Sequence, residues 1–470
     1  SPLSSSSAAS DVYKRQASGS PRQCMLDLAV RVIARAGRDA VAVCTVAEQT
    51  DVEVKEAKKL FASDEQLADE AKAYLDKLVI HYLDEQEKYL SPDATALDRM
   101  RAMATGFFEF AQKHPVYFDA FTFTQAAPSL HSYELSFDDY LQRSGKRPTL
   151  DVLLNIARDC IEEAGGPRDA DLVRIQAVSL LVGVHGISHL CTTGVLRHLS
   201  PTAKKQTFNA CLDYLSAGLA VGFAHGAIPP QDPVAMGGSL PADKRIRAKD
   251  LPRGNDGEVV RALLRGAVED IVDSGLSNMH LGTAAERAGI DFDRATHLIE
   301  GDQKLLSLLE KHIDAIAHEH LREQMRYAGG KSLGFSTMKA CAFGYLGFAH
   351  HDPVGFLGLT MITSGSIVPA SFERKDLINS RFEMGETFGY FMTIARDALD
   401  EAGGPRTPWA LYTMVMSMWS TIHGFAHLTT FGALRDQPRE FLFDLASRIF
   451  DIELVGIAEH LGIKGQIQGF

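Results

Sequence analysis

The stretch Glu163-Ala-Gly-Gly-Pro-Arg168 decides how this chain is organised, because it returns as Glu401-Ala-Gly-Gly-Pro-Arg406. The same offset of 238 in residue number carries His185-Gly186-x-x-His189 onto His423-Gly424-x-x-His427. The two copies align without a gap from about Gly37 to Arg197. Because this period is far longer than that of solenoid repeats, the sequence predicts a duplicated domain. A protein that works as a homodimer would become a single-chain pseudo-dimer in this way.

The bulk composition is that of a soluble globular protein. The chain has 470 residues, of which 45% are hydrophobic, enough for several domains with cores of their own. Its net charge of −12 disfavours non-specific adhesion to nucleic acid. None of the six cysteines forms a C-x-x-C pair. We therefore expect no disulfide framework, no metal and no other cofactor, and a cytoplasmic location.

Two segments lie outside this simple description. Residues 1–16 are rich in Ser and Ala and lack the apolar region of a signal peptide, so we expect residues 1–22 to be a disordered leader. Residues 409–434 contain no Asp, Glu, Lys or Arg, but they include two histidines, and the equivalent segment of the first copy contains Arg174. The sequence therefore predicts a long buried helix there and no membrane partner.

Helical spacing of apolar side chains dominates both copies. Leu67, Ala71, Leu75 and Leu78 recur at three- and four-residue steps. The Gly-Gly-Pro elements of the two copies predict helix ends, and Thr407-Pro408 predicts the start of the next helix. Alternation typical of strands is scarce, so the predicted fold class is all-α.

The predicted domains follow the repeat and the Pro/Gly-rich segment between the copies. They are a leader (1–22), a degenerate helix-turn-helix domain (23–90), a helical sensor and dimerisation domain (91–227), a linker (228–257), a second degenerate helix-turn-helix domain (258–328) and a second sensor domain (329–470).

Each copy begins with a recurring pattern of glycines, alanines and apolar residues. The first copy has Gly37-x-Asp39-Ala40-Val41-x-Val43 followed by Val46-Ala47-Glu48, and the second keeps Ala285-Glu286-x-Ala288-Gly289-Ile290. Further along lies Trp419-x-x-x-His423-Gly424. These motifs resemble the helix-turn-helix and the WHG-type sensor domain of the tetracycline-repressor family of bacterial regulators. The resemblance covers nearly all of both copies after residue 25. It implies a DNA-binding domain followed by a helical domain that dimerises and binds a small apolar effector.

The positions that contact DNA in that family are mostly changed here. The threonine before the first helix of the motif is Ala42 in the first copy and His280 in the second. The lysine on the phosphate side is an acid in both copies, Asp64 and Asp302. The turn glycine is Asp51 in the first copy, although the second copy retains it. These departures predict weak binding of double-stranded DNA.

Charge agrees with that expectation. Residues 27–88 carry 14 acids against 9 bases, and residues 258–323 carry 13 acids against 7 bases. A surface that contacts DNA normally carries excess positive charge. One basic cluster remains in the first copy, which is either a phosphate-contacting face or a solvated helix face. The candidate DNA-binding residues are Thr45, Lys55, Lys58, Lys59 and Arg294.

The His-Gly motifs have a functional and a structural interpretation. Two histidines four residues apart share one helix face and form a possible half-site for zinc, but no acidic ligand follows at the spacing of a metalloprotease. A glycine in mid-helix costs about 1 kcal/mol, which is tolerated where another helix must approach closely. We therefore expect packing within or between the copies through His185, Gly186, His189, His423, Gly424 and His427.

Aromatic residues at helical spacing mark either plain core or the lining of an effector pocket. The candidates in the first copy are Met103, Phe107, Phe110 and Phe118, and those in the second are Phe343, Tyr345, Phe348 and Phe356. They include no polar group that would name a ligand, so a small apolar effector is what the resemblance implies. Motifs for a phosphate-binding loop or a nucleophile elbow are absent, and we expect no catalytic residues and no enzyme activity.

Two functional interpretations remain open. The first is a transcriptional regulator whose two copies form an intramolecular pseudo-dimer, so that the chain is monomeric. The second is a ligand- or protein-binding module of the same fold that no longer binds DNA.

Overall fold

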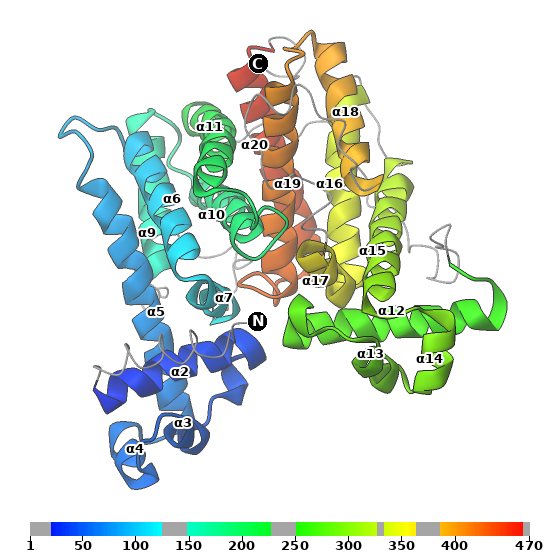
Figure 1. The fold of residues 1–470 in the computed structure, drawn as a ribbon. Helices are drawn as coiled ribbons and strands as arrows, with labels where there is room; N and C mark the ends of the chain where they lie inside the picture. The colour runs from blue at the N-terminus through cyan, green and yellow to red at the C-terminus, as the bar shows by residue number, and fades with distance from the viewer. Residues whose placement is uncertain (1–19, 125–147, 227–250, 327–332, 363–385, 464–470) are drawn as a thin grey trace.

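The computed structural model describes residues 20–124, 148–226, 251–326, 333–362 and 386–463. Every regular element in these ranges is a helix, so the described part of the protein is all-α, as predicted (Figure 1). We call residues 20–226 the first half and residues 251–463 the second half.

The helices of the two halves follow one another in the same order. The first half contains α2 (Pro21–Ala36), η1 (Arg38–Ala40), α3 (Val43–Gln49), α4 (Val54–Leu60), α5 (Asp64–Glu87), α6 (Ala96–Lys113), α7 (Pro115–Thr124), α9 (Pro148–Glu163), α10 (Ala170–Thr192) and α11 (Pro201–His225). The second half contains α12 (Gly254–Ser274), η3 (Leu276–Asn278), α13 (Leu281–Ala288), α14 (Phe292–Leu298), α15 (Asp302–Met325), α16 (Leu333–His351), α17 (Pro353–Ile362), α18 (Glu386–Ala402), α19 (Pro408–Thr430) and α20 (Arg439–Leu461).

Helix starts recur at the offset found in the sequence. Asp64 begins α5 and Asp302 begins α15, while Pro115 begins α7 and Pro353 begins α17, and the residue numbers of each pair differ by the same offset. The two halves therefore have nearly the same succession of helix lengths and turns.

Local chemistry explains where the helices begin and end. The Thr407 hydroxyl accepts a hydrogen bond from the Ala410 amide, and Pro408 is the first residue of α19, which confirms the predicted start. The chain leaves α9 and α18 through Gly165 and Gly403, which adopt positive φ angles of 72° and 68°. Glycine reaches this left-handed region without steric cost, so the predicted helix ends are confirmed.

Two predicted boundaries differ from the structure. The leader was expected to reach residue 22, but α2 begins at Pro21, because the Ser20 side chain caps it by accepting from the Gln23 amide. The linker was expected to reach residue 257, but α12 begins at Gly254. Glycine-rich composition favoured a loop there, yet Gly257 lies in the first turn of the helix and packs closely against the Pro252 carbonyl group. The rest of the expected leader and linker, residues 1–19 and 228–250, lies outside the described ranges.

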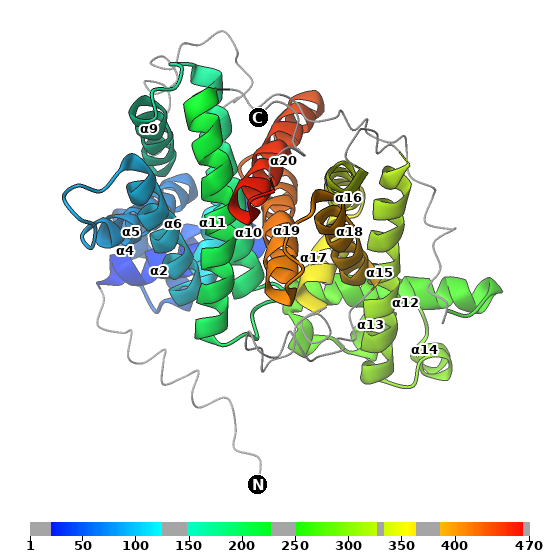
Figure 2. The ribbon, with the colours of Figure 1, turned by 90° about the horizontal axis from the view of Figure 1, so that it is seen from above.

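The long helices α10, α11, α19 and α20 lie in the centre of the molecule, where the two halves meet (Figures 1 and 2). The short helices α3 and α4 of the first half and α13 and α14 of the second lie at the same end of the molecule, the lower edge of Figure 1. This arrangement sets the short helices of both halves beneath one shared helical centre.

The central helices are buried along most of their length. Nearly every residue of α19 from Ala410 to Thr429 is buried, so the predicted long buried helix is confirmed. Among the described helices, α10 is long and apolar enough to cross a membrane, but 78% of its apolar window is buried inside the protein. A buried core helix satisfies the same length and composition test.

Candidate functional site

The two halves meet where α10 crosses α19 at a pair of glycines. A Cβ atom on Gly186 would overlap the carbonyl oxygen of Ser420, and one on Gly424 would overlap the carbonyl oxygen of Val182. Each contact becomes the other when the residue numbers are shifted by the offset of the repeat. Only glycine lets two helix backbones come this close, which explains why both motifs tolerate its helix-weakening effect.

A second crossing, between α11 and α20, has the same form. A Cβ atom on Gly218 would overlap the carbonyl oxygen of Ile452, and one on Gly456 would overlap that of Tyr214. Gly218 and Gly456 are again equivalent positions of the repeat. No histidine accompanies these glycines, so this pair was not predicted, although the shared offset between two mid-helix glycines was a usable signal.

The four histidines of the motifs form two hydrogen-bonded pairs across the same contact. His185 Nε2 lies 3.1 Å from His427 Nδ1, and His423 Nε2 lies 2.9 Å from His189 Nδ1. All four rings are buried. The structure thus brings together all six residues expected at a packing contact, and it does so between halves rather than within one half.

Burial also fixes the charge state of these rings. Removal from water lowers the pKa of all four imidazoles, to about 4 for His189 and well below the usual value for the other three. A neutral imidazole donates from one nitrogen and accepts at the other, so each pair needs no metal or counter-charge. In the described ranges no group of three or more His, Cys, Asp or Glu side chains is arranged to hold a metal ion.

A cavity of about 80 Å³ lies in the first half, beside this contact. Its wall is almost wholly apolar, with Thr122, Thr149 and His185 as its polar members. It is lined by Leu83, Met103, Ala104, Phe107, Phe121, Thr122, Thr149, Leu150, Leu153, Val178, Leu180, Leu181, Val184, His185, Leu428, Ala433 and Leu434. The last three residues belong to the second half, so the cavity is completed across the junction.

The predicted ligand residues of the first half divide into two groups. Met103 and Phe107 line the cavity. Phe110 and Phe118 are buried behind its wall, where Phe118 stacks on the His185 ring at a centroid distance of 5.0 Å.

The second-half candidates lie in packed core. The rings of Tyr345 and Phe348 contact Phe356, and Phe343 packs on Phe450. Thr122 and Thr149 were not predicted as cavity residues, because isolated threonines in apolar helices carry no distinctive pattern.

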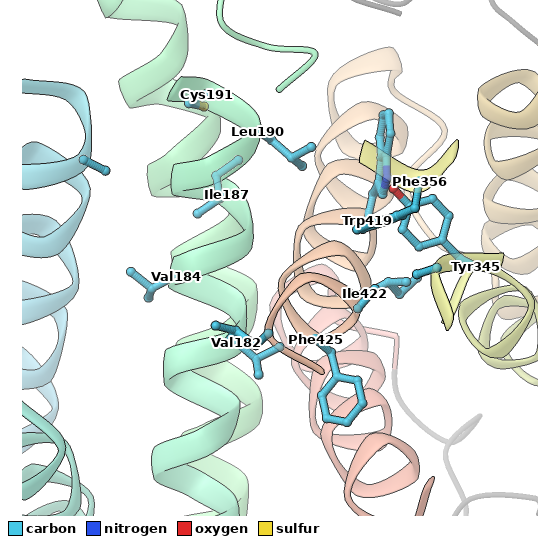
Figure 3. Close-up of a cluster of buried hydrophobic side chains, with 14 of the residues drawn as sticks. Val182, Val184, Ile187, Leu190, Cys191, Tyr345, Phe356, Trp419, Ile422 and Phe425 are labelled. Carbon is cyan, nitrogen blue, oxygen red and sulfur yellow. The ribbon is translucent and has the colours of Figure 1, made fainter. Parts of the chain in front are cut away.

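The equivalent positions of the second half carry larger side chains. Leu150, Leu153 and Leu181 of the cavity wall are partly exposed, whereas their counterparts are fully packed aromatic residues. Those counterparts are Phe388, Phe391 and Trp419, which are 4%, 6% and 4% exposed. The Phe388 and Trp419 rings contact each other at a centroid distance of 5.4 Å, and Figure 3 shows Trp419 next to Tyr345.

Among the short helices, the predicted basic cluster is exposed and the predicted arginine is ion-paired. Thr45 on α3 is exposed, as are Lys55, Lys58 and Lys59 on α4. Arg294 on α14 forms an ion pair with Asp256 of α12. A guanidinium that already has a carboxylate partner is less available to phosphate.

The acids that replace the phosphate-side lysine have a structural role. The Asp64 carboxylate accepts a hydrogen bond of 2.7 Å from the Val43 amide at the start of α3, and Asp302 accepts one of 2.7 Å from the Leu281 amide at the start of α13. Since Ala42 has no side chain that caps α3, the acid supplies the cap from another helix. The sequence comparison identified these acids only as departures from the DNA-contacting pattern.

Two buried sites with ionisable side chains were also not predicted from the sequence. Lys339 Nζ lies 2.8 Å from Asp451 Oδ1, with both side chains almost fully buried. The Glu453 carboxylate accepts from the hydroxyls of Ser417 and Thr421, but burial dominates and raises its pKa to about 7. The corresponding residue of the first half is Leu215, so this acid belongs to one half only.

A comparison with protein families assigns part of the first half. Residues 100–215 match the family model described as the tetracyclin repressor-like C-terminal domain. This range runs from α6 into α11 and includes most of the cavity wall, His185 and Gly186. Part of the first half is therefore similar to a tetracyclin repressor-like C-terminal domain. A search of curated proteins finds no match to the chain.

Proposed function

We propose that this protein is a transcriptional regulator of the tetracycline-repressor type, built from two copies that pair within one chain. The observation that carries the proposal is the reciprocity of the contacts, in which Gly186 meets Ser420 while Gly424 meets Val182. A twofold arrangement of two equivalent parts produces such exchanged contacts. The repeated helix order supports the same conclusion.

Oligomeric state tests this architecture. If the two halves pair within the chain, the full-length protein is monomeric at micromolar concentration in light scattering. A stable dimer of full-length chains would contradict the pairing within one molecule, because the glycine surfaces would then be shared between molecules.

DNA binding is proposed to be weak and to come mainly from the first half. The exposed Lys55, Lys58 and Lys59 provide the one basic cluster found at either helix-turn-helix end among the described residues. Replacing all three with Ala should weaken binding to every duplex and flatten the dependence of log K on log salt by about one unit for each phosphate that is no longer neutralised. Fluorescence anisotropy over a salt series measures both quantities.

Arg294→Ala is the matched control for this experiment. It removes one positive charge from the equivalent end of the second half, where the Asp256 carboxylate already neutralises it, so it should change binding less. Nanomolar binding to one operator in physiological salt would contradict the proposal. A strong decrease with Arg294→Ala and none with the lysine variant would contradict it as well.

The cavity of the first half is proposed to bind a small apolar effector in the cytoplasm. Its apolar wall and its position beside the junction support this role, since an occupant contacts Leu428 and Leu434 of the second half as well as the first. Binding there would change how the halves pack and hence how the helix-turn-helix ends are held.

The second candidate function is an effector- or protein-binding module that does not bind DNA. The neutralised Arg294 and the acids at both ends favour it. Complete absence of DNA binding at low salt, with effector binding retained, would select this alternative.

A further inference from the structure

Equivalent positions of the two halves carry side chains of different size at the cavity wall. At three positions of the cavity wall the first half has Leu150, Leu181 and Phe107, and the second half has Phe388, Trp419 and Tyr345. In the second half these three side chains are buried, and the Trp419 ring contacts Phe388. The space that remains open in the first half is therefore filled by protein in the second.

A hydrogen bond in the second half indicates which polar group a ligand of the first half needs. In the second half the Tyr345 hydroxyl lies 3.2 Å from His423 Nδ1, while His423 Nε2 bonds to His189. In the first half His185 Nε2 bonds to His427, but the residue at the tyrosine position is Phe107, which has no hydroxyl. Both His185 and Phe107 line the cavity. Among the described residues no side chain or backbone group bonds to His185 Nδ1.

We propose that the chain binds one effector, in the first half only, and that this effector is a small aromatic molecule with a single hydroxyl or N–H group. The aromatic part occupies the space that Trp419 and Phe388 fill in the second half. The polar group bonds to His185 Nδ1 as the Tyr345 hydroxyl bonds to His423. This inference rests on the effector binding proposed above and adds its stoichiometry and its ligand class.

The same geometry connects the bound molecule to the junction of the halves. His185 bonds directly to His427 of α19 and stacks on Phe118. A hydrogen bond at Nδ1 fixes the tautomer of a neutral imidazole and strengthens donation from Nε2. The occupant therefore acts on the contact that holds the two halves together.

Reciprocal exchange of one residue pair tests the stoichiometry. The probe is phenol, whose single ring and hydroxyl match the proposed ligand class, measured by equilibrium dialysis against the full-length protein. The wild-type chain should bind one equivalent, Leu181→Trp should bind none because the indole fills the cavity, and Trp419→Leu should bind two. Circular dichroism checks that each variant retains its helix content. Because Leu181→Trp removes no buried side chain, it keeps the test decisive if Trp419→Leu fails to fold.

A matched pair of probes tests the polar contact. The ratio of the affinities for phenol and toluene isolates the hydroxyl group. In Phe107→Tyr the protein supplies that hydroxyl, as the second half does, so the ratio should fall about fivefold, the effect of one net hydrogen bond. An unchanged ratio would overturn the assigned ligand class.

The remaining outcomes separate this inference from the proposed function. Two equivalents bound by the wild-type chain, or full binding by Leu181→Trp, would overturn the single-site inference and leave the regulator proposal to its DNA test. No binding by the wild-type chain would overturn the inference and the effector role together, while DNA binding would still decide whether the protein is a regulator.

Discussion

The cores of the two halves contain helices in the same order, but positions that line a cavity in the first half carry buried aromatic side chains in the second. The difference lies in a few side chains, since Leu181 faces open space where Trp419 packs against Phe388. The glycine crossings at Gly186 and Gly424 have remained equivalent. Backbone contacts between the halves thus tolerate little change, whereas the volume inside each half can be redistributed by substitution at single positions.

The largest expected effect tests the equivalence of the glycine crossings. Gly186→Ala and Gly424→Ala each drive a methyl group into a backbone carbonyl of the opposite helix. We expect each to lower the free energy of unfolding by about 3–5 kcal/mol, because neither backbone can move without opening the junction. Urea denaturation of the two variants measures this decrease.

Gly347→Ala is the control for those variants. Gly347 lies inside α16, and a Cβ atom there would meet nothing within 4 Å. Alanine should stabilise the helix by about 0.5–1 kcal/mol. Clearly unequal decreases for Gly186→Ala and Gly424→Ala would show that the two crossings are not equivalent.

The second effect concerns the buried acid of the second half. Burial raises the pKa of Glu453 to about 7 from its ordinary value of 4.5. The folded protein therefore holds a proton that the unfolded chain releases, and stability falls as pH rises from about 4.5 to 7. Glu453→Gln should remove this decrease and stabilise the protein by roughly 3 kcal/mol at pH 8, but little at pH 4.

Unfolding midpoints at the two pH values measure the Glu453 effect, with the exposed Glu459→Gln on the same helix as control. Glu453→Leu installs the residue of the first half and should behave similarly at high pH. Equal midpoints for wild type and Glu453→Gln at pH 8 would show that interactions in the folded protein fully offset the cost of burying the carboxylate.

The third effect concerns His189, which changes stability with pH in the direction opposite to Glu453. Burial lowers the pKa of His189 to about 4 from 6.5, so its contribution to stability is present above pH 6.5 and is lost as pH falls toward 4. At pH 5 the folded protein should have lost about 2 kcal/mol from this residue alone. Denaturation at pH 7 and pH 5 should show a smaller decrease for His189→Gln than for wild type. The exposed His81→Gln serves as control, and an equal decrease in all three proteins would exclude His189 as the cause.

The smallest expected effect concerns the turn between the short helices of each half. Asp51 and Gly289 are equivalent turn residues with positive φ angles of 56° and 65°. Because glycine adopts this conformation without strain, Asp51→Gly should stabilise by about 0.5–1 kcal/mol and Gly289→Asp should destabilise by a similar amount. Thermal unfolding of the two variants measures both changes, and shifts of the same sign would show that the two turns are not equivalent.

Several features of the fold followed from local sequence. The constant offset between the copies predicted that two halves would share one helix order, and Thr407-Pro408 and Gly403 marked where α19 and α18 begin and end. Such signals work because capping, proline geometry and glycine conformations act within a few residues of the chain. The same locality limits them, as the helix that begins at Gly254 shows.

The all-α class, and the glycines that stand beside paired histidines at a constant offset, followed from the sequence alone. Packing in three dimensions settled that His185 bonds to His427 rather than to a residue of its own half. It also decided that Asp64 caps α3, and that Phe107 faces a cavity while Tyr345 faces a filled core. These outcomes depend on the volumes and atoms that meet when segments far apart in the chain pack together, and no local pattern encodes that complementarity.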